Sequence, residues 1–452
     1  MPEHLKVMVV DDTITYRMIM KKVAETIPGI EVVASAPNGK VALDKISTVM
    51  PDVVLCDVEM PVMDGLTTLK EVSKQFPKVT VVMVSGLSRS NANIIMECLN
   101  AGALDFVTKP LESNADQAMR ALRLDLEPIL SVIVTKKSTP GAPPAPTPAT
   151  PQASAPTPAP TQRPAPGSRP APPARPGIGQ PRQPFSGGTR GAPAQANRLP
   201  PAGQRPQLGA AAGQQPRNLH RPAGTGGLAA RQQPGQPPAA AGMRPQPRRP
   251  IATPSIQKVK RPELLLIGSS TGGPAALTQV LAGLGGKKLS IPTLIVQHMP
   301  PVFTASLAAQ LTRSSGLQVD EADEGVQIGP GSIVLAQGGK HMTLRCQGKQ
   351  FIVSLNDGPK VNECRPAVDV LFMSIAAGFP GQTLSIILTG MGRDGTNGID
   401  ALKRTNKTYS ITQDQDSCVV YGMPRSVVEK GLSDEALPLT AIGSRIQEIC
   451  GV

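Results

Sequence analysis

A proline-rich segment in the middle of the chain divides it into parts that must fold separately. Residues 138–257 contain 30 prolines and 13 arginines but no aspartate, glutamate or lysine. Runs such as PAPTPATPQASAPTPAPTQRPAP offer too little apolar surface to offset the entropy lost on ordering them. We therefore predict a long disordered, partly polyproline-like linker over 138–258, between an N-terminal domain over 1–137 and a C-terminal domain over 259–452.

The basic character of the chain comes from this linker. The formal net charge is +13, with 46 basic and 33 acidic residues. Without the 13 linker arginines, 33 basic residues balance 33 acidic ones. Tryptophan is absent and aromatic residues make up 2% of the chain, so we expect no nucleic-acid partner for the folded domains. A solubilising spacer is favoured over a segment that binds an acidic surface.

The chain has no feature of a secreted or membrane-inserted protein. Its N-terminus, MPEHLKVMVV, lacks the layout of a signal peptide. No apolar run approaches the ~18 residues of a membrane span. We expect a cytoplasmic protein without membrane insertion. Six cysteines are scattered without metal-like spacing: Cys56, Cys98, Cys346, Cys364, Cys418 and Cys450.

The N-terminal domain alternates strand and helix patterns. Five apolar runs predict strands: LKVMVV (5–10), IEVVASA (30–36), DVVLCD (52–57), VTVVMVS (79–85) and DFVTK (105–109). Valine-rich strands separated by amphipathic stretches are typical of a parallel sheet covered on both faces.

Polar residues follow four of these strands: Asp11, Asp12, Asp57, Ser85 and Lys109. The carboxyl ends of parallel strands form one crevice, so these five side chains should converge. Three carboxylates repel one another unless a hard cation neutralises them, which predicts Mg²⁺. A lysine and a hydroxyl could then contact a phosphoryl group on one carboxylate. Strand-end aspartates are also common turn formers and helix caps, but five such residues together disfavour that interpretation.

At the motifs VVDD, LCDVEMPVMDG, VMVSG and DFVTKP the chain closely resembles a response-regulator receiver domain. The resemblance implies a flavodoxin-like fold in which Asp57 is phosphorylated and the two VVDD aspartates hold Mg²⁺ with it. It also implies that Ser85 and Lys109 transmit the structural change that phosphorylation causes, and that Phe106 is the aromatic switch residue. A histidine kinase would supply the phosphoryl group.

The C-terminal domain has the pattern of a second α/β sheet. Its predicted strands are LLLIGSS (264–270), PTLIVQHM (292–299), GSIVLAQ (331–337), QFIVSLN (350–356), TLSIILTG (383–390) and TYSITQ (408–413). Helical stretches follow several of them. We predict a doubly wound parallel sheet as the core.

The first of these strands runs into the small, hydroxyl-rich turn GSSTGG. Neither the dinucleotide fingerprint nor the Walker loop is present. A phosphate cradle at a helix start remains possible. The segment 268–272 also fits G-x-S-x-G, in which a tight turn lifts the middle serine, Ser270, out of the sheet. Alone this signal is weak, because a turn that caps a helix is commoner.

A serine nucleophile requires a base, and the chain has four histidines. His4 lies near the N-terminus and His220 in the linker. His298 ends the strand that follows the GSSTGG unit, so we favour it over His341, which follows a Gly-Gly turn and starts a strand that leads elsewhere. A single strand-end histidine is, however, more often structural.

The base in turn requires a carboxylate to orient it. Asp394, in the glycine-rich loop after SIILTG, is our candidate. Asp369 is the alternative, or a surface charge on the helical stretch PAVDVLFMSIAA. The chain order serine, histidine, aspartate disfavours an α/β-hydrolase fold.

Together, IGSSTGG, LIVQHMP and LTGMGRDG closely resemble the catalytic domain of chemotaxis protein-glutamate methylesterases. The resemblance implies hydrolysis of glutamate methyl esters on the cytoplasmic part of methyl-accepting chemoreceptors, often with glutamine deamidation, and no cofactor in this domain. Ser270 would attack the ester, His298 transfer the proton and Asp394 orient the imidazole. The Met391 amide would stabilise the oxyanion, with Thr271 in support. Ser269 stands where the family often has alanine.

The resemblance also implies that the unphosphorylated receiver hinders the catalytic cleft. Compared with a linker eight-fold shorter, this linker is longer by three doublings, which cost about 2 kcal/mol of closure entropy and predict weaker inhibition of the catalytic domain by the receiver.

Two other functions compete with this interpretation. A signalling adaptor would bind a phosphorylated ligand through GSSTGG without catalysis, and a transcriptional regulator is disfavoured because a small helical DNA-binding tail is missing.

Overall fold

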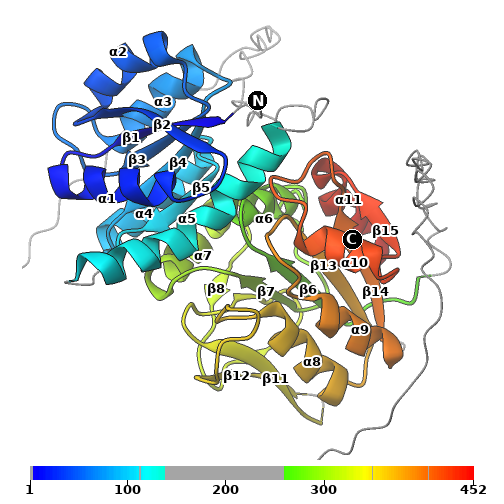
Figure 1. Ribbon diagram of the computed structural model, residues 1–452. Helices are drawn as coiled ribbons and strands as arrows, with labels where there is room; N and C mark the ends of the chain where they lie inside the picture. The colour runs from blue at the N-terminus through cyan, green and yellow to red at the C-terminus, as the bar shows by residue number, and fades with distance from the viewer. Residues whose placement is uncertain (1–3, 111–113, 138–258, 349, 406) are drawn as a thin grey trace, which may run out of the picture. The chain divides into compact units, whose positions relative to one another are not determined.

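The computed structural model describes residues 4–110, 114–137, 259–348, 350–405 and 407–452. The predicted linker over 138–258 lies outside the described residues. The described residues form an N-terminal and a C-terminal α/β domain (Figure 1). In the described part of the chain, no helix is long and apolar enough to cross a bilayer.

The N-terminal domain is a five-stranded parallel sheet with the order β2-β1-β3-β4-β5, which is the flavodoxin-like order. The strands are β1 (Leu5–Val10), β2 (Ile30–Ala36), β3 (Val53–Asp57), β4 (Thr80–Ser85) and β5 (Asp105–Thr108). The helices are α1 (Ile14–Glu25), α2 (Gly39–Val49), α3 (Gly65–Gln75), α4 (Arg89–Asn100) and α5 (Ala115–Lys137). Each of the five predicted strands is present, within one residue at either end.

Alternate residues of β1 are buried on opposite faces of this sheet. Leu5, Val7 and Val9 pack with apolar side chains of α1 and α5. Met8 and Val10 pack with those of α2, α3 and α4. The helices therefore cover both faces, as the continuous apolar strands predict.

The C-terminal domain is built on a seven-stranded parallel sheet with the order β15-β14-β13-β6-β7-β10-β8. Its strands are β6 (Leu264–Ser269), β7 (Thr293–Gln297), β8 (Asp320–Glu321), β10 (Ile333–Leu335), β13 (Thr383–Ile387), β14 (Thr408–Gln413) and β15 (Glu435–Leu437). The chain proceeds from β6 to one side of the sheet and returns to β13 on the other. The ends of β6 and β13 therefore flank the topological switch point, where open α/β sheets bind their ligands.

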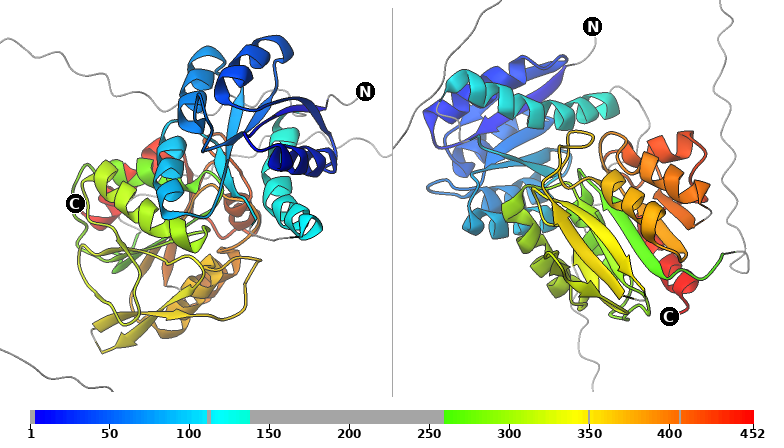
Figure 2. Two further views of the ribbon diagram at one scale, coloured as in Figure 1. Left: turned by 90° about the vertical axis from the view of Figure 1, so that its left-hand side faces the viewer. Right: turned by 90° about the horizontal axis from the view of Figure 1, so that it is seen from below.

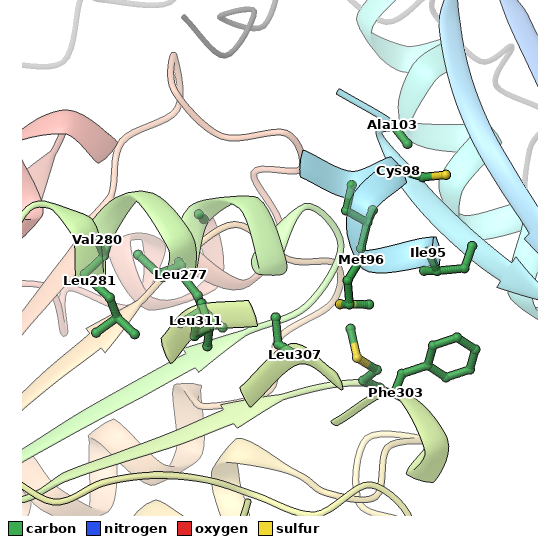
Figure 3. Packing of buried hydrophobic residues seen from close by; sticks show 14 of the residues in the cluster. Ile95, Met96, Cys98, Ala103, Leu277, Val280, Leu281, Phe303, Leu307 and Leu311 are labelled. Carbon is green, nitrogen blue, oxygen red and sulfur yellow. The ribbon is translucent and has the colours of Figure 1, made fainter. Parts of the chain in front are cut away.

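Helices cover both faces of this sheet as well. They are α6 (Gly273–Ala282), α7 (Pro301–Ser315), α8 (Val368–Gly378), α9 (Thr396–Arg404), α10 (Met423–Glu429) and α11 (Leu439–Cys450). Leu265 and Ile267 of β6 pack on the side of α6, α7 and α11. Leu264 and Leu266 pack on the side of α8, α9 and α10. Figure 3 shows leucines of α6 and α7 from the first of these layers.

A separate three-stranded antiparallel sheet has the order β11-β12-β9. It comprises β9 (Gln327–Ile328), β11 (His341–Gln347) and β12 (Gln350–Asn356), with the β11–β12 pair drawn in yellow in Figure 2. The predicted strand QFIVSLN is thus β12, outside the parallel sheet. His341 is the first residue of β11, which leads away from the parallel sheet as expected.

Candidate active site

The end of β6 lies beside the end of β7 and the loop after β13. Ser269 pairs with Gln297 in the β6–β7 register, and the His298 amide donates to the Ser269 carbonyl at 3.1 Å. On the other side, the Ser270 amide donates to the Thr389 carbonyl at 3.1 Å. Ser270 and His298 therefore leave adjacent strands at the same edge of the sheet.

Close backbone packing explains the small residues around Ser270. A Cβ on Gly273 would lie 2.0 Å from Gln297 Oε1, and one on Gly390 would lie 2.8 Å from the Ser270 Cβ. Gly272 has a φ of 73°, a left-handed conformation that glycine adopts without strain. The turn after β6 thus allows the chain to reverse into α6 while the β13 loop approaches Ser270.

His298 and Asp394 are in direct contact. The His298 Nε2 lies 2.7 Å from Asp394 Oδ2. Two amides at the start of α8, those of Val368 at 2.6 Å and Asp369 at 3.0 Å, also donate to this carboxylate. Burial raises the pKa of Asp394, but the contact with His298 and these amides outweighs burial and lowers it. The carboxylate is therefore ionised and held in one orientation.

The environment of His298 favours its protonated form. Burial lowers the pKa of the imidazole, whereas hydrogen bonds to Asp394 and Cys364 raise it, and the net result is a pKa of about 10. Because Asp394 is an acceptor only, the nitrogen that faces it, Nε2, carries a proton. The nitrogen left to act as a base is Nδ1.

Nδ1 contacts a cysteine rather than Ser270. The Cys364 Sγ lies 3.3 Å from His298 Nδ1. Within the residues that the structure describes, the Ser270 hydroxyl makes no hydrogen bond. The expected contact between serine and imidazole is thus not formed, although both residues lie at the same edge.

The alternative base and the alternative carboxylate have structural contacts of their own. His341 is buried, with Nε2 2.9 Å from the Pro359 carbonyl and Nδ1 accepting from the Ala367 amide. Asp369 is 1% exposed and accepts a hydrogen bond from the Gly398 amide at 2.7 Å. The interpretation of Asp369 as a surface charge is wrong, because α9 packs over this part of α8.

The acidic cluster of the N-terminal domain is also assembled. Lys109 Nζ lies 2.7 Å from both Asp11 Oδ2 and Asp57 Oδ2. Oxygens of Asp11, Asp12 and Asp57 lie within 4.8 Å of one another. Burial raises the pKa of Asp57 to about 6, because Lys109 offsets this effect only in part and Asp11 adds to it. Three carboxylates and one ammonium leave an excess of negative charge, and this all-oxygen donor set fits Mg²⁺.

Of the two other residues predicted to take part in the switch, Ser85 lies at this edge, whereas Phe106 lies further back on its strand, opposite Met83. Ser85 is the last residue of β4 and is fully buried, and its carbonyl accepts from the Lys109 amide at 2.7 Å. Phe106 lies on β5 and is half-buried.

Comparisons with known proteins agree with this architecture. Residues 7–121 match the family described as "Response regulator receiver domain", and residues 265–446 match "CheB methylesterase". A protein named protein-glutamate methylesterase/protein-glutamine glutaminase from Desulfotalea psychrophila is 35% identical over 449 residues, covering 98% of both chains. The chain belongs to the CheB methylesterase family.

Two further relatives of this methylesterase are matched over nearly their whole length. A protein-glutamate methylesterase/protein-glutamine glutaminase of Rhodopseudomonas palustris is 33% identical and covers 98% of this chain and 94% of its own. The CheB methylesterase catalytic domain of Thermotoga maritima, known from a crystal structure, is 39% identical in sequence. The match covers 42% of this chain and 99% of that one, with a TM-score of 0.40.

The remaining predicted residues of the methylesterase site flank Ser270. The Thr271 carbonyl accepts a hydrogen bond from Thr389 Oγ1 at 3.0 Å, which ties the turn after β6 to the loop after β13. Met391 follows Gly390 and is 40% exposed. Within the described residues, the Met391 amide has no hydrogen-bond acceptor. It is therefore free to donate to a ligand.

Sequence reasoning did not find two side chains that contact the His298–Asp394 pair. Asn362 Nδ2 donates to Asp394 Oδ1 at 2.8 Å and to Asp369 Oδ2 at 3.0 Å, and Cys364 contacts His298. Both lie in the segment VNEC before α8, which carries no recognised motif and no glycine to mark the turn. Only the fold brings this segment to the imidazole.

Proposed function

We propose that this methylesterase removes methyl groups from glutamate methyl esters, and deamidates glutamines, on the cytoplasmic domains of methyl-accepting chemoreceptors. The observation that carries the proposal is the His298–Asp394 pair at the end of β7, next to the end of β6, which Ser270 follows, at the switch point of a parallel sheet. The names of relatives that match nearly the whole chain, protein-glutamate methylesterase/protein-glutamine glutaminase, support the substrate class.

The proposed reaction is acyl transfer through a serine ester. The Ser270 hydroxyl oxygen attacks the ester carbonyl while its proton passes to His298 Nδ1, and the Met391 amide donates to the resulting oxyanion. Thr271 keeps the turn in place. The bond between the carbonyl carbon and the methoxy oxygen then breaks, and methanol leaves with the proton from His298. Water hydrolyses the acyl-serine to the glutamate carboxylate by the same proton transfers, and with glutamine the first leaving group is ammonia.

The N-terminal domain would regulate this activity through phosphorylation of Asp57 by a histidine kinase. Asp11 and Asp12, together with Asp57, would hold Mg²⁺, which offsets the negative charge of the phosphoryl group and of the carboxylates. Lys109 and Ser85 would contact the phosphoryl oxygens, and Phe106, on the neighbouring strand, would change its packing in response. Phosphorylation would increase the rate of methanol release.

The test is release of labelled methanol from methyl-labelled receptor membranes by the full chain. We expect Ser270→Ala to lower the rate on the order of 10⁴-fold or more. Ser269→Ala is the matched control, since the Ser269 hydroxyl donates to Gln297 Oε1 at 2.6 Å inside the protein. It should keep the rate within about 10-fold of the unmodified chain while lowering stability by about 1–2 kcal/mol. Receptor binding without methanol release from the unmodified chain would instead favour the adaptor.

A second experiment tests regulation through phosphorylation of Asp57. Acetyl phosphate with Mg²⁺ should increase methanol release by the unmodified chain, and Asp57→Asn should abolish this increase while retaining the basal rate. An equal response of both proteins to acetyl phosphate would exclude Asp57 as the regulatory site.

A further inference from the structure

Backbone hydrogen bonds close the turn that carries Cys364. Val361 and Cys364 exchange two backbone hydrogen bonds, of 3.1 and 3.0 Å. The two residues between them, Asn362 and Glu363, have φ values of 51° and 62°. Two consecutive left-handed residues are typical of a type I′ turn, which glycine and asparagine favour. The turn therefore presents Asn362 and Cys364 in fixed directions.

Asn362 anchors this turn to the catalytic carboxylate. Its Nδ2 bridges Asp394 and Asp369, two buried side chains, at 2.8 and 3.0 Å. Cys364 is consequently held relative to Asp394, which is the residue that orients His298. The same short segment thus contacts both members of the histidine–carboxylate pair.

Cys364 meets the imidazole at the nitrogen that the reaction uses. With Nε2 on Asp394, Nδ1 is the base nitrogen, and the Cys364 Sγ lies 3.3 Å from it. We propose that Cys364 is a positioning residue, which holds His298 Nδ1 in the free enzyme and is replaced there by the Ser270 hydroxyl when an ester binds. The proposal rests on the proposed function only for the second of these steps.

A thiol suits this role because it is both a weak donor and a weak acceptor. It can donate S–H to the neutral imidazole and accept N–H from the imidazolium. The contact therefore persists in both protonation states, so the ring need not rotate about its own axis when the proton moves. Because the contact is weak, an incoming hydroxyl can replace it at small cost.

The titratable groups that act on the imidazole are Asp394 and Cys364. A sulfur that accepts the Nδ1 proton stabilises the charged form of the ring. Loss of this acceptor should lower the pKa of His298 by less than about one unit, because a hydrogen bond to sulfur is weaker than an ordinary one.

The experiment compares Cys364→Ala and Cys364→Ser with Cys346→Ser in the full chain. Cys346 is the matched control because it is also half-buried but lies on β11. Histidine-selective NMR follows the titration of His298, and methanol release gives kcat and KM. We expect Cys364→Ala to lower the His298 pKa and to reduce the pH-independent kcat/KM on the order of 10-fold through a higher KM, with little change in kcat. Cys364→Ser should restore most of both, and Cys346→Ser should change neither.

The two readouts separate failure of this proposal from failure of the proposed function. An unchanged His298 titration in Cys364→Ala would overturn the positioning role whatever the activity. So would a Cys364→Ser variant whose titration and kcat/KM match those of Cys364→Ala. If no variant released methanol but the titration shifted as expected, the contact would stand and the proposed substrate would be wrong.

Discussion

His298 Nε2 lies 2.7 Å from Asp394 Oδ2, although 96 residues separate the two in the chain. The contact forms because β7 and the loop after β13 end at the same edge of the sheet, on either side of β6. The first amides of α8 point at the same carboxylate, so the free donors of a helix start keep it ionised in a buried position. The imidazole and the carboxylate are thereby held in one arrangement.

Replacement of Asp394 tests this arrangement. In Asp394→Asn the side chain can no longer fix the proton on Nε2, and we expect kcat for methanol release to fall on the order of 10³- to 10⁴-fold with a smaller change in KM. Asp369→Asn is the control, because Asp369 is equally buried and also accepts from Asn362 but, within the described residues, does not contact His298. It should lower thermal stability and retain most of kcat. Equal losses of kcat in the two variants would contradict an orienting role for Asp394.

If His298 is the base, as proposed, its pKa predicts the pH dependence of the esterase. Its pKa of about 10 lies above the ordinary value of 6.5, since the contacts with Asp394 and Cys364 outweigh burial. Only the neutral imidazole accepts a proton, so kcat/KM should increase about tenfold per unit from pH 7 towards 10. Asp394→Asn should shift this rise of kcat/KM to lower pH. Rates are corrected with Ser270→Ala for spontaneous ester hydrolysis, and a flat profile above pH 7 would contradict the prediction.

The raised pKa of His298 also makes the stability of the fold depend on pH. A folded-state pKa above the unfolded value means that protonated His298 stabilises the fold. This contribution is complete below about pH 6.5 and is lost as the pH rises through about 10. The stability difference between the unmodified chain and Asp394→Asn should therefore shrink with increasing pH, which chemical denaturation at pH 6 and 10 would measure.

The strands and the polar residues at their ends could be predicted because they depend on local patterns. Continuous valine and isoleucine runs mark buried parallel strands, and the crevice rule brings Asp57 or His298 to the shared edge. The burial of Asp369 depends instead on how α9 packs on α8. The contact between Cys364 and His298, 66 residues apart, depends on a left-handed turn without glycine. Such long-range contacts have no periodic signal in the sequence.

The close approach of Gly390 to Ser270 predicts a steric effect on catalysis. A Cβ at position 390 would lie 2.4 Å from the Met423 Sδ and 2.8 Å from the Ser270 Cβ. Gly390→Ala must therefore displace the loop that carries Met391, and we expect a 10- to 100-fold loss of kcat, roughly what a displacement of ~1 Å costs.

Gly392→Ala is the matched control for this loop. Gly392 has a φ of 83°, and nothing lies within 4 Å of a Cβ built there. The substitution should cost about 1–2 kcal/mol of stability through backbone strain and change kcat only a few-fold. A Gly390→Ala variant with normal kcat would show that the loop tolerates displacement.

Mg²⁺ should stabilise the N-terminal domain through its acidic cluster. The raised pKa of Asp57 means that its protonated form favours the folded state, so this contribution is full below about pH 3.8 and is lost as the pH rises through about 6. At pH 7 the cluster therefore carries uncompensated charge that a divalent cation relieves. A cation present at 100 times its Kd would add about 2.7 kcal/mol to the free energy of unfolding.

Calorimetry of the full chain with and without MgCl₂ would measure this stabilisation as an upward shift of one unfolding transition. The shift should be smaller at pH 5, where Asp57 is mostly protonated, and should be strongly reduced in Asp57→Asn. Asp52→Asn is the matched control, because Asp52 pairs with Lys137 at 2.8 Å instead of joining the cluster, and it should keep the full response to Mg²⁺. Equal shifts in the two variants would place the cation somewhere other than at Asp11, Asp12 and Asp57.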